Sequence, residues 1–124
     1  MPTFEQGDVI KVPFPCTDRA TRQSRPALVV STGTLETAHG LLWVAMITSA
    51  ANRGWPGDVA VEDLAQAGLP APSVIRTAKI ATIESSDARR LGRIAAAQRR
   101  QVIRRVVRVL GDTVRPDRGR PALR

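Results

Sequence analysis

Cysteine and histidine are almost absent from this chain of 124 residues, which contains one of each, Cys16 and His39. A single cysteine excludes the disulfide framework of small secreted domains. One imidazole excludes a histidine pair, and one thiol beside it is too little for a zinc site built from Cys and His ligands. We therefore expect Cys16 to be a neutral or structural thiol in a reducing compartment and His39 to be an exposed side chain.

Clustered carboxylates are also missing. Glu62 and Asp63 form the only adjacent acidic pair, and neighbouring residues at the end of a strand point to opposite sides. A two-metal nuclease needs several carboxylates around its ions. We therefore expect no metal and no cofactor, so that any chemistry on phosphate would use arginines, hydroxyls and backbone amides.

Long apolar segments are absent as well. The longest apolar run, Leu41 to Ile47, has seven residues, whereas a membrane-spanning helix needs roughly 20. The polar N-terminal segment MPTFEQGD lacks the apolar core of a signal peptide. The expected location is the cytoplasm, with no membrane partner.

Acidic residues are scarce in the last third of the chain. Residues 1–84 carry a net charge of −1, whereas residues 85–124 contain twelve Arg and three Asp and carry +9. A basic region of this kind attracts nucleic acid, acidic peptides or anionic membranes. The alternative is compositional, because this chain contains only two lysines and uses Arg as its general solvating cation.

Alternating apolar residues predict a mainly β protein. In segment 8–14, Ile10, Val12 and Phe14 share one face while Lys11 points the other way, which predicts a half-buried strand. Further strands are expected at 27–31, 41–48, 58–62 and 73–83, and the mixed phase of the last suggests a bulge. A polar loop is expected between the first two strands, over residues 15–24.

Two helices are expected after the strands. Ser85 to Asp87 have the character of an N-cap, which predicts a short helix ending at Gly92. A second helix is predicted from Ala95 to Leu110, with apolar residues on one side and arginines opposite. These elements predict a small β-barrel with a C-terminal helix packed on it.

One domain, residues 1–111, is predicted to contain this barrel, and a basic tail, residues 112–124, is predicted to be disordered. Two apolar runs in the domain, 27–30 and 41–47, lack alternation. A strand of this kind is covered on both faces. The second cover is either a helix of the same chain or another subunit, and the latter would make the protein a homodimer.

Five segments, in this order and spacing, resemble the MazF/PemK family of toxin endoribonucleases over residues 4–111. They are Gly7–Pro15 (GDVIKVPFP), Arg25–Val30 (RPALVV), Ile47–Ser49 (ITS), Gly68-Leu69 followed by Ser73-Val74, and Arg90–Ile94 (RLGRI). Any one of these segments is a weak signal, but the ordered set is fairly specific.

The resemblance implies an SH3-like barrel with a C-terminal helix, assembled as a homodimer that binds single-stranded RNA in a groove across the two subunits. Members of the family cut RNA without metal, generally through a cyclic phosphate, and leave a 5′-hydroxyl. An antitoxin with an acidic, flexible C-terminal segment occupies the groove and blocks it.

The resemblance also implies the catalytic residues. The family's active arginine lies in the "RP" motif, which is Arg25 here, and its partner hydroxyl ends the third strand, which is Thr48 here. Arg25 would hold the scissile phosphate and assist proton transfer, and Thr48 would donate to a phosphate oxygen as charge develops. The alternatives are a solvent-exposed arginine at a strand start and a threonine that merely favours a strand.

Four further residues are candidates for substrate binding. Asp18 would orient Arg25 or only cap its turn, and Arg53 would contact RNA or lie in an ordinary surface loop. Ser49 belongs to the same motif as Thr48, and Lys79 stands where some members carry Gln, so the RNA sequence preference does not transfer.

Two competing functions remain open. Toxins of the same fold poison DNA gyrase without cutting RNA, but they use a C-terminal end containing tryptophan, whereas Trp43 and Trp55 are internal here. A protein of the membrane surface would place Trp or Phe on the apolar side of its basic helix, and residues 95–110 contain neither.

Overall fold

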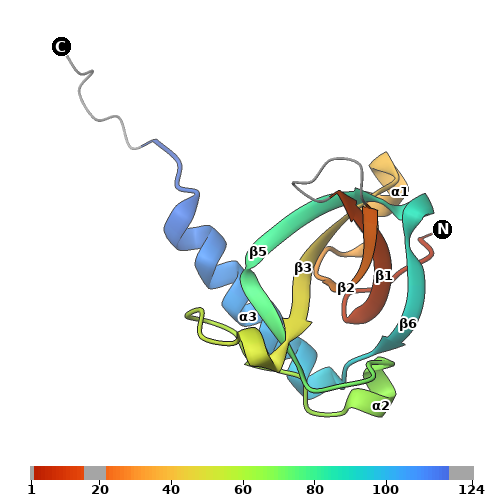
Figure 1. The fold of residues 1–124 in the computed structure, drawn as a ribbon. Helices are drawn as coiled ribbons and strands as arrows, with labels where there is room; N and C mark the ends of the chain where they lie inside the picture. The colour runs from red at the N-terminus through yellow and green to blue at the C-terminus, as the bar shows by residue number, and fades with distance from the viewer. Residues whose placement is uncertain (1, 16–21, 118–124) are drawn as a thin grey trace.

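A computed structural model describes residues 2–15 and 22–117 of the chain. These residues form strands, helices and two 3-10 turns (Figure 1). The strands are β1 (Asp8–Pro15), β2 (Arg22–Val29), β3 (Leu41–Ser49), β4 (Val59–Ala60), β5 (Ser73–Glu84) and β6 (Arg89–Arg93). The helices are α1 (Gly33–His39), α2 (Leu64–Ala67) and α3 (Ala96–Thr113), and the 3-10 turns are η1 (Ala50–Asn52) and η2 (Ser85–Asp87). Of the helices in this part of the chain, none is both long and apolar enough to span a membrane.

The strands form one antiparallel sheet in the order β4-β5-β3-β2-β1-β6. The sheet curls strongly, so that β6 and β5 face each other across the interior in Figure 1. The predicted bulge in β5 is confirmed, because the register against β3 shifts between Ala45, which faces Ile80, and Met46, which faces Arg76. The prediction of a mainly β, curled barrel-like sheet with a C-terminal helix is confirmed.

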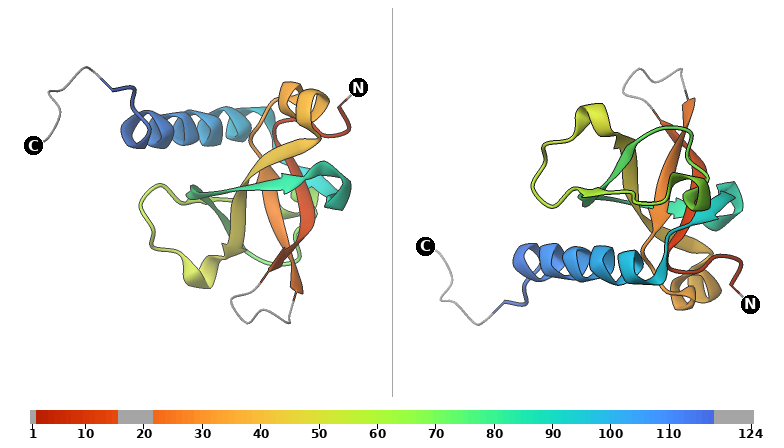
Figure 2. Two further views of the ribbon diagram at one scale, coloured as in Figure 1. Left: turned by 90° about the horizontal axis from the view of Figure 1, so that it is seen from above. Right: turned by 90° about the horizontal axis from the view of Figure 1, so that it is seen from below.

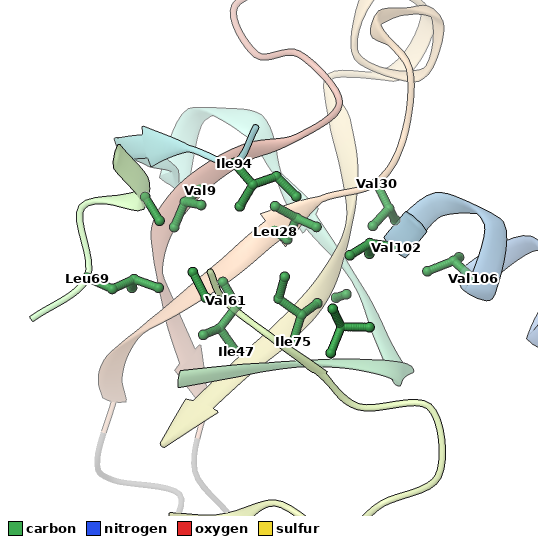
Figure 3. Packing of buried hydrophobic residues seen from close by; sticks show 13 residues of the cluster. Val9, Leu28, Val30, Ile47, Val61, Leu69, Ile75, Ile94, Val102 and Val106 are labelled. Carbon is green, nitrogen blue, oxygen red and sulfur yellow. The ribbon is translucent and has the colours of Figure 1, made fainter. Parts of the chain in front are cut away.

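Apolar side chains of β2 and β3 alternate between two cores. Leu28, Ala45 and Ile47 belong to the larger core, which α3 closes with Val102 and Val106 (Figure 3). The smaller core lies on the other face of the same strands. It contains Phe4, Ile10, Val12, Ala27, Val29, Leu42 and Val44, with Ala81, Ile83 and Ala88 packed against it.

The cover of the two apolar runs therefore comes from the chain itself. One face meets α3, and the other meets the second half of β5, where Ala81 and Ile83 lie. Within the runs 27–30 and 41–47, Trp43 is 42% exposed and Leu41 is partly exposed, while the other side chains are buried without a second subunit. The lack of alternation in these runs is therefore not an argument for a homodimer. A homodimer stays a prediction that must rest on other surfaces.

Helix α3 is longer than predicted, because it continues through Gly111 to Thr113. The part of the helix up to Val106 packs on the sheet, whereas its C-terminal end projects beyond the barrel (Figure 2). Val107 is 60% exposed and Leu110 is 38% exposed. The apolar side predicted from the helical periodicity is therefore only partly covered in this chain.

The prediction of a helix ending at Gly92 is wrong. Only Ser85–Asp87 turn, as a 3-10 turn, and the chain then forms β6, which pairs with β1 from Asp8 to Lys11.

Strands β1 and β2 extend into the loop predicted at residues 15–24, because β1 continues to Pro15 and β2 begins at Arg22. Helices α1 and α2 have no counterpart among the sequence predictions; each ends at a glycine with positive φ.

Candidate active site

A cleft of about 530 Å³ opens beside the middle of β2 and the end of β3, between η1 and the loop that leads from α2 into β5. Five segments contribute to its walls, and most of their side chains are small, polar or proline. The lining residues are Lys11, Ser24, Arg25, Pro26, Ile47, Thr48, Ser49, Asn52, Gly68, Leu69, Pro70, Ala71, Pro72, Ser73 and Leu91.

Arg25 and Thr48 both line this cleft. Arg25 lies inside β2, where it faces Val12 of β1, rather than at the start of a strand as predicted. Its side chain is exposed, so its guanidinium can meet a ligand from solvent. Two residues that are 23 positions apart in sequence thus reach one cavity because β2 and β3 are adjacent in the sheet.

Thr48 is half-buried near the end of β3, where it faces Val74 of β5. Its Oγ1 accepts a hydrogen bond of 3.0 Å from Nδ2 of Asn52. A hydroxyl has one donor and two acceptor positions. Because Asn52 uses an acceptor position, the hydroxyl hydrogen of Thr48 is left for a ligand in the cleft.

Lys11 also lines the cleft, and the sequence predictions of site residues did not include it. It is exposed on β1, between Pro26 of β2 and Arg89 of β6. The signal was present in the alternation of β1, which directs Lys11 away from the face of Ile10 and Val12. With Lys11 and Arg25, the cleft carries two cations suited to phosphate oxygens.

The other predicted substrate-binding residues are placed differently. Ser49 lines the cleft, and its Oγ accepts from the Ala51 backbone N–H at 3.2 Å, which caps η1. Arg53 follows η1, and Lys79 lies in the bulged stretch of β5; both are exposed and neither lines the cleft. Asp18 lies outside the described residues.

Next to Asn52 of the cleft lies a buried ion pair that the sequence predictions also missed. Arg76 of β5, only 8% exposed, binds both carboxylate oxygens of Asp58, with Nε donating to Oδ1 at 3.2 Å and Nη2 to Oδ2 at 3.0 Å. Burial by itself raises the pKa of Asp58, but the hydrogen bond and charge of Arg76 and the backbone N–H groups of Trp55 and Gly54 outweigh it and lower that pKa.

Comparison with known protein families identifies the chain. A family model described as "PemK-like, MazF-like toxin of type II toxin-antitoxin system" matches residues 5–110. The chain belongs to the PemK/MazF toxin family. Curated protein sequences include no significant match.

Solved structures share the fold of this PemK/MazF toxin. A MazE-MazF complex from Deinococcus radiodurans is similar with a TM-score of 0.70 and 22% identity, over 87% of this chain and 96% of the other. An endoribonuclease in complex with its cognate antitoxin, from a Mycobacterial species, has a TM-score of 0.67 and 17% identity, over 90% and 96%. The toxin MazF-mt6 of Mycobacterium tuberculosis has a TM-score of 0.60 and 24% identity, over 79% and 90%.

Asp8 of the PemK/MazF toxin has a structural position. Its side chain is buried and accepts from Nη2 of Arg90 at 2.7 Å and from the Glu5 backbone N–H at 2.9 Å, while Arg93 lies 3.6 Å away. The carboxylate therefore joins β1 to β6. Two of the segments that carry the family resemblance, around Asp8 and around Arg90, are tied together by this contact.

Metal-binding groups are dispersed in the toxin. Within residues 2–15 and 22–117, no three His, Cys, Asp or Glu side chains come close enough to hold a metal ion together. What converges at the cleft is a set of cations and hydroxyls, Lys11, Arg25, Thr48 and Ser49. Such a set can bind phosphate oxygens and stabilise negative charge that develops on them.

Proposed function

We propose that this PemK/MazF toxin is a sequence-specific endoribonuclease that cuts single-stranded RNA without a metal ion and so inhibits translation and growth. The observation that carries the proposal is the convergence of Arg25 and Thr48 on one cleft. Both residues occupy the family motif positions, and they come from different strands. The family membership and the fold shared with an endoribonuclease of a Mycobacterial species support the same activity.

The reaction that fits these groups is an internal transesterification. The 2′-oxygen of the ribose attacks phosphorus, the bond between phosphorus and the 5′-oxygen breaks, and a 2′,3′-cyclic phosphate and a 5′-hydroxyl result. The proton lost from the 2′-oxygen balances the proton gained by the 5′-oxygen. Arg25 holds the phosphate and assists this exchange, while Thr48 donates to a phosphoryl oxygen as its negative charge grows.

The partners follow from the charge of the cleft. Lys11 and Arg25 would attract an acidic antitoxin segment as well as RNA, and the net charge of +8 strengthens that attraction at a distance. Toxins of this fold have been solved together with MazE or with a cognate antitoxin. We include in the proposal a homodimer, a cognate antitoxin with an acidic flexible C-terminal segment, and a cytoplasmic site of action.

The test uses purified full-length protein with mixed single-stranded RNA oligonucleotides in EDTA. Wild type should cut at defined sequences and leave a cyclic phosphate. Arg25→Ala should abolish cleavage, and Thr48→Ala should lower kcat by about 100-fold or more, the usual effect of losing one donor to a developing oxyanion. Gln101→Ala, an exposed change on α3, is the control and should cut like wild type.

Three results would contradict the proposal or part of it. If wild type leaves every RNA intact, the chain is a binding module of this fold rather than a nuclease. If Arg25→Ala cuts as fast as wild type, the cleft is not the active site. Cleavage that appears only when a divalent metal replaces EDTA would remove the claim of metal independence.

A further inference from the structure

The loop between β3 and β4, residues 50–58, is held by side chains rather than by a hairpin ladder. Arg76 of β5 reaches it with its guanidinium, which lies 4.2 Å from the centre of the Trp55 ring. Thr77 Oγ1 donates to the Gly57 carbonyl at 2.9 Å. Asp58 accepts from the Trp55 backbone N–H at 3.3 Å as well as from Arg76. These contacts tie Trp55, Gly57 and Asp58 of the loop to β5.

Asn52 is the member of this loop that reaches the cleft. Its backbone carbonyl accepts from Nη2 of Arg76 at 2.7 Å, the same nitrogen that binds Asp58. Its side-chain amide donates to Oγ1 of Thr48 at 3.0 Å. The buried ion pair is thus connected to the Thr48 hydroxyl through one residue.

The direction of the hydrogen bond from Asn52 to Thr48 matters for the proposed cleavage reaction. A threonine hydroxyl on a strand rotates among several donor directions when nothing binds its oxygen. With the amide hydrogen of Asn52 on one lone pair, the hydroxyl hydrogen of Thr48 cannot point toward Asn52. Its remaining directions include the cleft, where a phosphoryl oxygen would accept it. A donor that is oriented before the reaction needs no reorganisation when charge develops.

We infer that Asn52 is a positioning residue for the Thr48 hydroxyl and that Arg76, paired with Asp58, holds Asn52 in place. The inference rests on the proposed nuclease function, because it assigns the hydroxyl a donor role in cleavage. Asn52 itself does not contact the reacting phosphate. Its contribution is made through Thr48 and should disappear when that hydroxyl is removed.

A double-mutant cycle tests this dependence. Full-length wild type, Asn52→Ala, Thr48→Ala and the double variant are compared for kcat and KM on one RNA oligonucleotide in EDTA. We expect Asn52→Ala to lower kcat by about 10-fold with little change in KM. The Thr48 hydroxyl would lose its orientation, and its hydrogen bond to the phosphoryl oxygen contributes in the transition state rather than to substrate binding. In the Thr48→Ala background the same change should alter kcat by less than about twofold.

The role of Arg76 in holding Asn52 is tested by a second cycle with Arg76→Lys. A lysine keeps a cation but cannot bind Asp58 and Asn52 together through a planar fork. We expect a kcat loss in otherwise wild-type protein and little further loss in the Asn52→Ala background. Thermal unfolding of each variant identifies any that has lost its fold, and the cycle between Asn52 and Thr48 stands without Arg76→Lys. Gln101→Ala is again the control.

The outcomes separate this inference from the nuclease proposal. A strong coupling of Asn52 to Thr48 supports the inference. If wild type cuts RNA and Thr48→Ala is defective, but the Asn52→Ala effect is the same in both backgrounds, the inference is overturned and the nuclease function stands. A rise in KM alone for Asn52→Ala also overturns it, because Asn52 would then bind substrate directly. If wild type cuts nothing, both are overturned.

Discussion

At the scale of single residues, two carboxylates that are largely removed from water hold arginines of the sheet in place. Asp8 binds Arg90, and Asp58 binds Arg76. Each is a charged pair whose carboxylate is largely removed from water, so loss of one partner leaves a charge without compensation. Only the second pair touches a residue of the cleft, through the Asn52 carbonyl. Substitutions at Asp58 should therefore affect stability first and catalysis through the loop.

Asp58→Asn should lower the free energy of unfolding at pH 7 by about 2 kcal/mol, between the values typical of exposed and fully buried pairs. The pKa of Asp58 is lowered in the folded protein. The stability that ionised Asp58 contributes is therefore complete above the pKa of an unfolded aspartate, at about pH 4, and is lost as pH falls through the lowered folded value. The gap between variant and wild type should shrink toward pH 3.

Urea unfolding at pH 7 and at pH 3 measures this gap. Asp87→Asn is the matched control, since Asp87 is exposed and makes no ion pair within the described part of the chain. It should change stability little at either pH. A gap for Asp58→Asn that is equally wide at both values would show that ionisation of this carboxylate is not its source.

At the scale of elements, the contact between α2 and β6 shapes one wall of the cleft. Both elements contribute a glycine where their backbones meet. A Cβ on Gly68 would overlap the Leu91 carbonyl oxygen, and a Cβ on Gly92 would overlap the Gln66 carbonyl oxygen and lie 2.6 Å from the Ala67 carbonyl carbon. Gly68 also ends α2 with a φ of +74°, which few other residues adopt without strain. The close approach of these two backbones positions residues 68–73, the segment after α2 that lines the cleft.

Gly92→Ala should therefore force α2 and β6 apart. We expect a loss of about 1–3 kcal/mol in the free energy of unfolding, the usual cost of overpacking, together with weaker cleavage because Gly68 and Leu91 line the cleft. Urea unfolding measures the first effect. Gly111→Ala is the control, because a Cβ there meets no atom within 4 Å and alanine favours the helix. If both variants unfold alike, the proposed steric contact is wrong.

At the scale of the whole molecule, one apolar surface is left without cover. A groove of about 420 Å³ lies between α1, the start of β3 and the second half of α3. Trp43 is 42% exposed there, beside Val107 and Leu110. Large exposed apolar patches in soluble proteins commonly mark interaction sites. The homodimer we propose is best supported by this surface, because apart from Trp43 the apolar runs of the sheet are largely covered within the chain.

Light scattering at micromolar concentration should therefore give twice the chain mass of 13.4 kDa. Val107→Asp should shift the protein toward monomer, since it places a charge on the apolar surface. Gln101→Asp, an exposed change on the same helix, should leave the mass unchanged. A wild-type monomer would remove the dimer from the proposal, and with it an RNA groove shared by two subunits.

Local patterns in the sequence determined much of this fold. The alternation of residues 8–14 predicted β1, and the mixed phase of residues 73–83 predicted a bulged β5. The ordered motifs led to the family and brought forward Arg25 and Thr48, whose roles in cleavage stay predictions. These signals succeed because side-chain alternation and short motifs are properties of neighbouring residues.

Tertiary structure alone decided the remaining features. Residues 89–93 follow a helix-capping signal, yet they form β6 because β1 offers a pairing partner about 80 residues earlier in the chain. The second face of the apolar strands is covered by the C-terminal half of β5, where Ala81 and Ile83 lie. Sequence periodicity cannot say which segment packs against a given face. The contact of Asn52 with Thr48, and of Arg76 with Asp58 and Asn52, depends on how a loop folds back over β5. These are contacts between segments distant in sequence, and only packing in three dimensions brings them together.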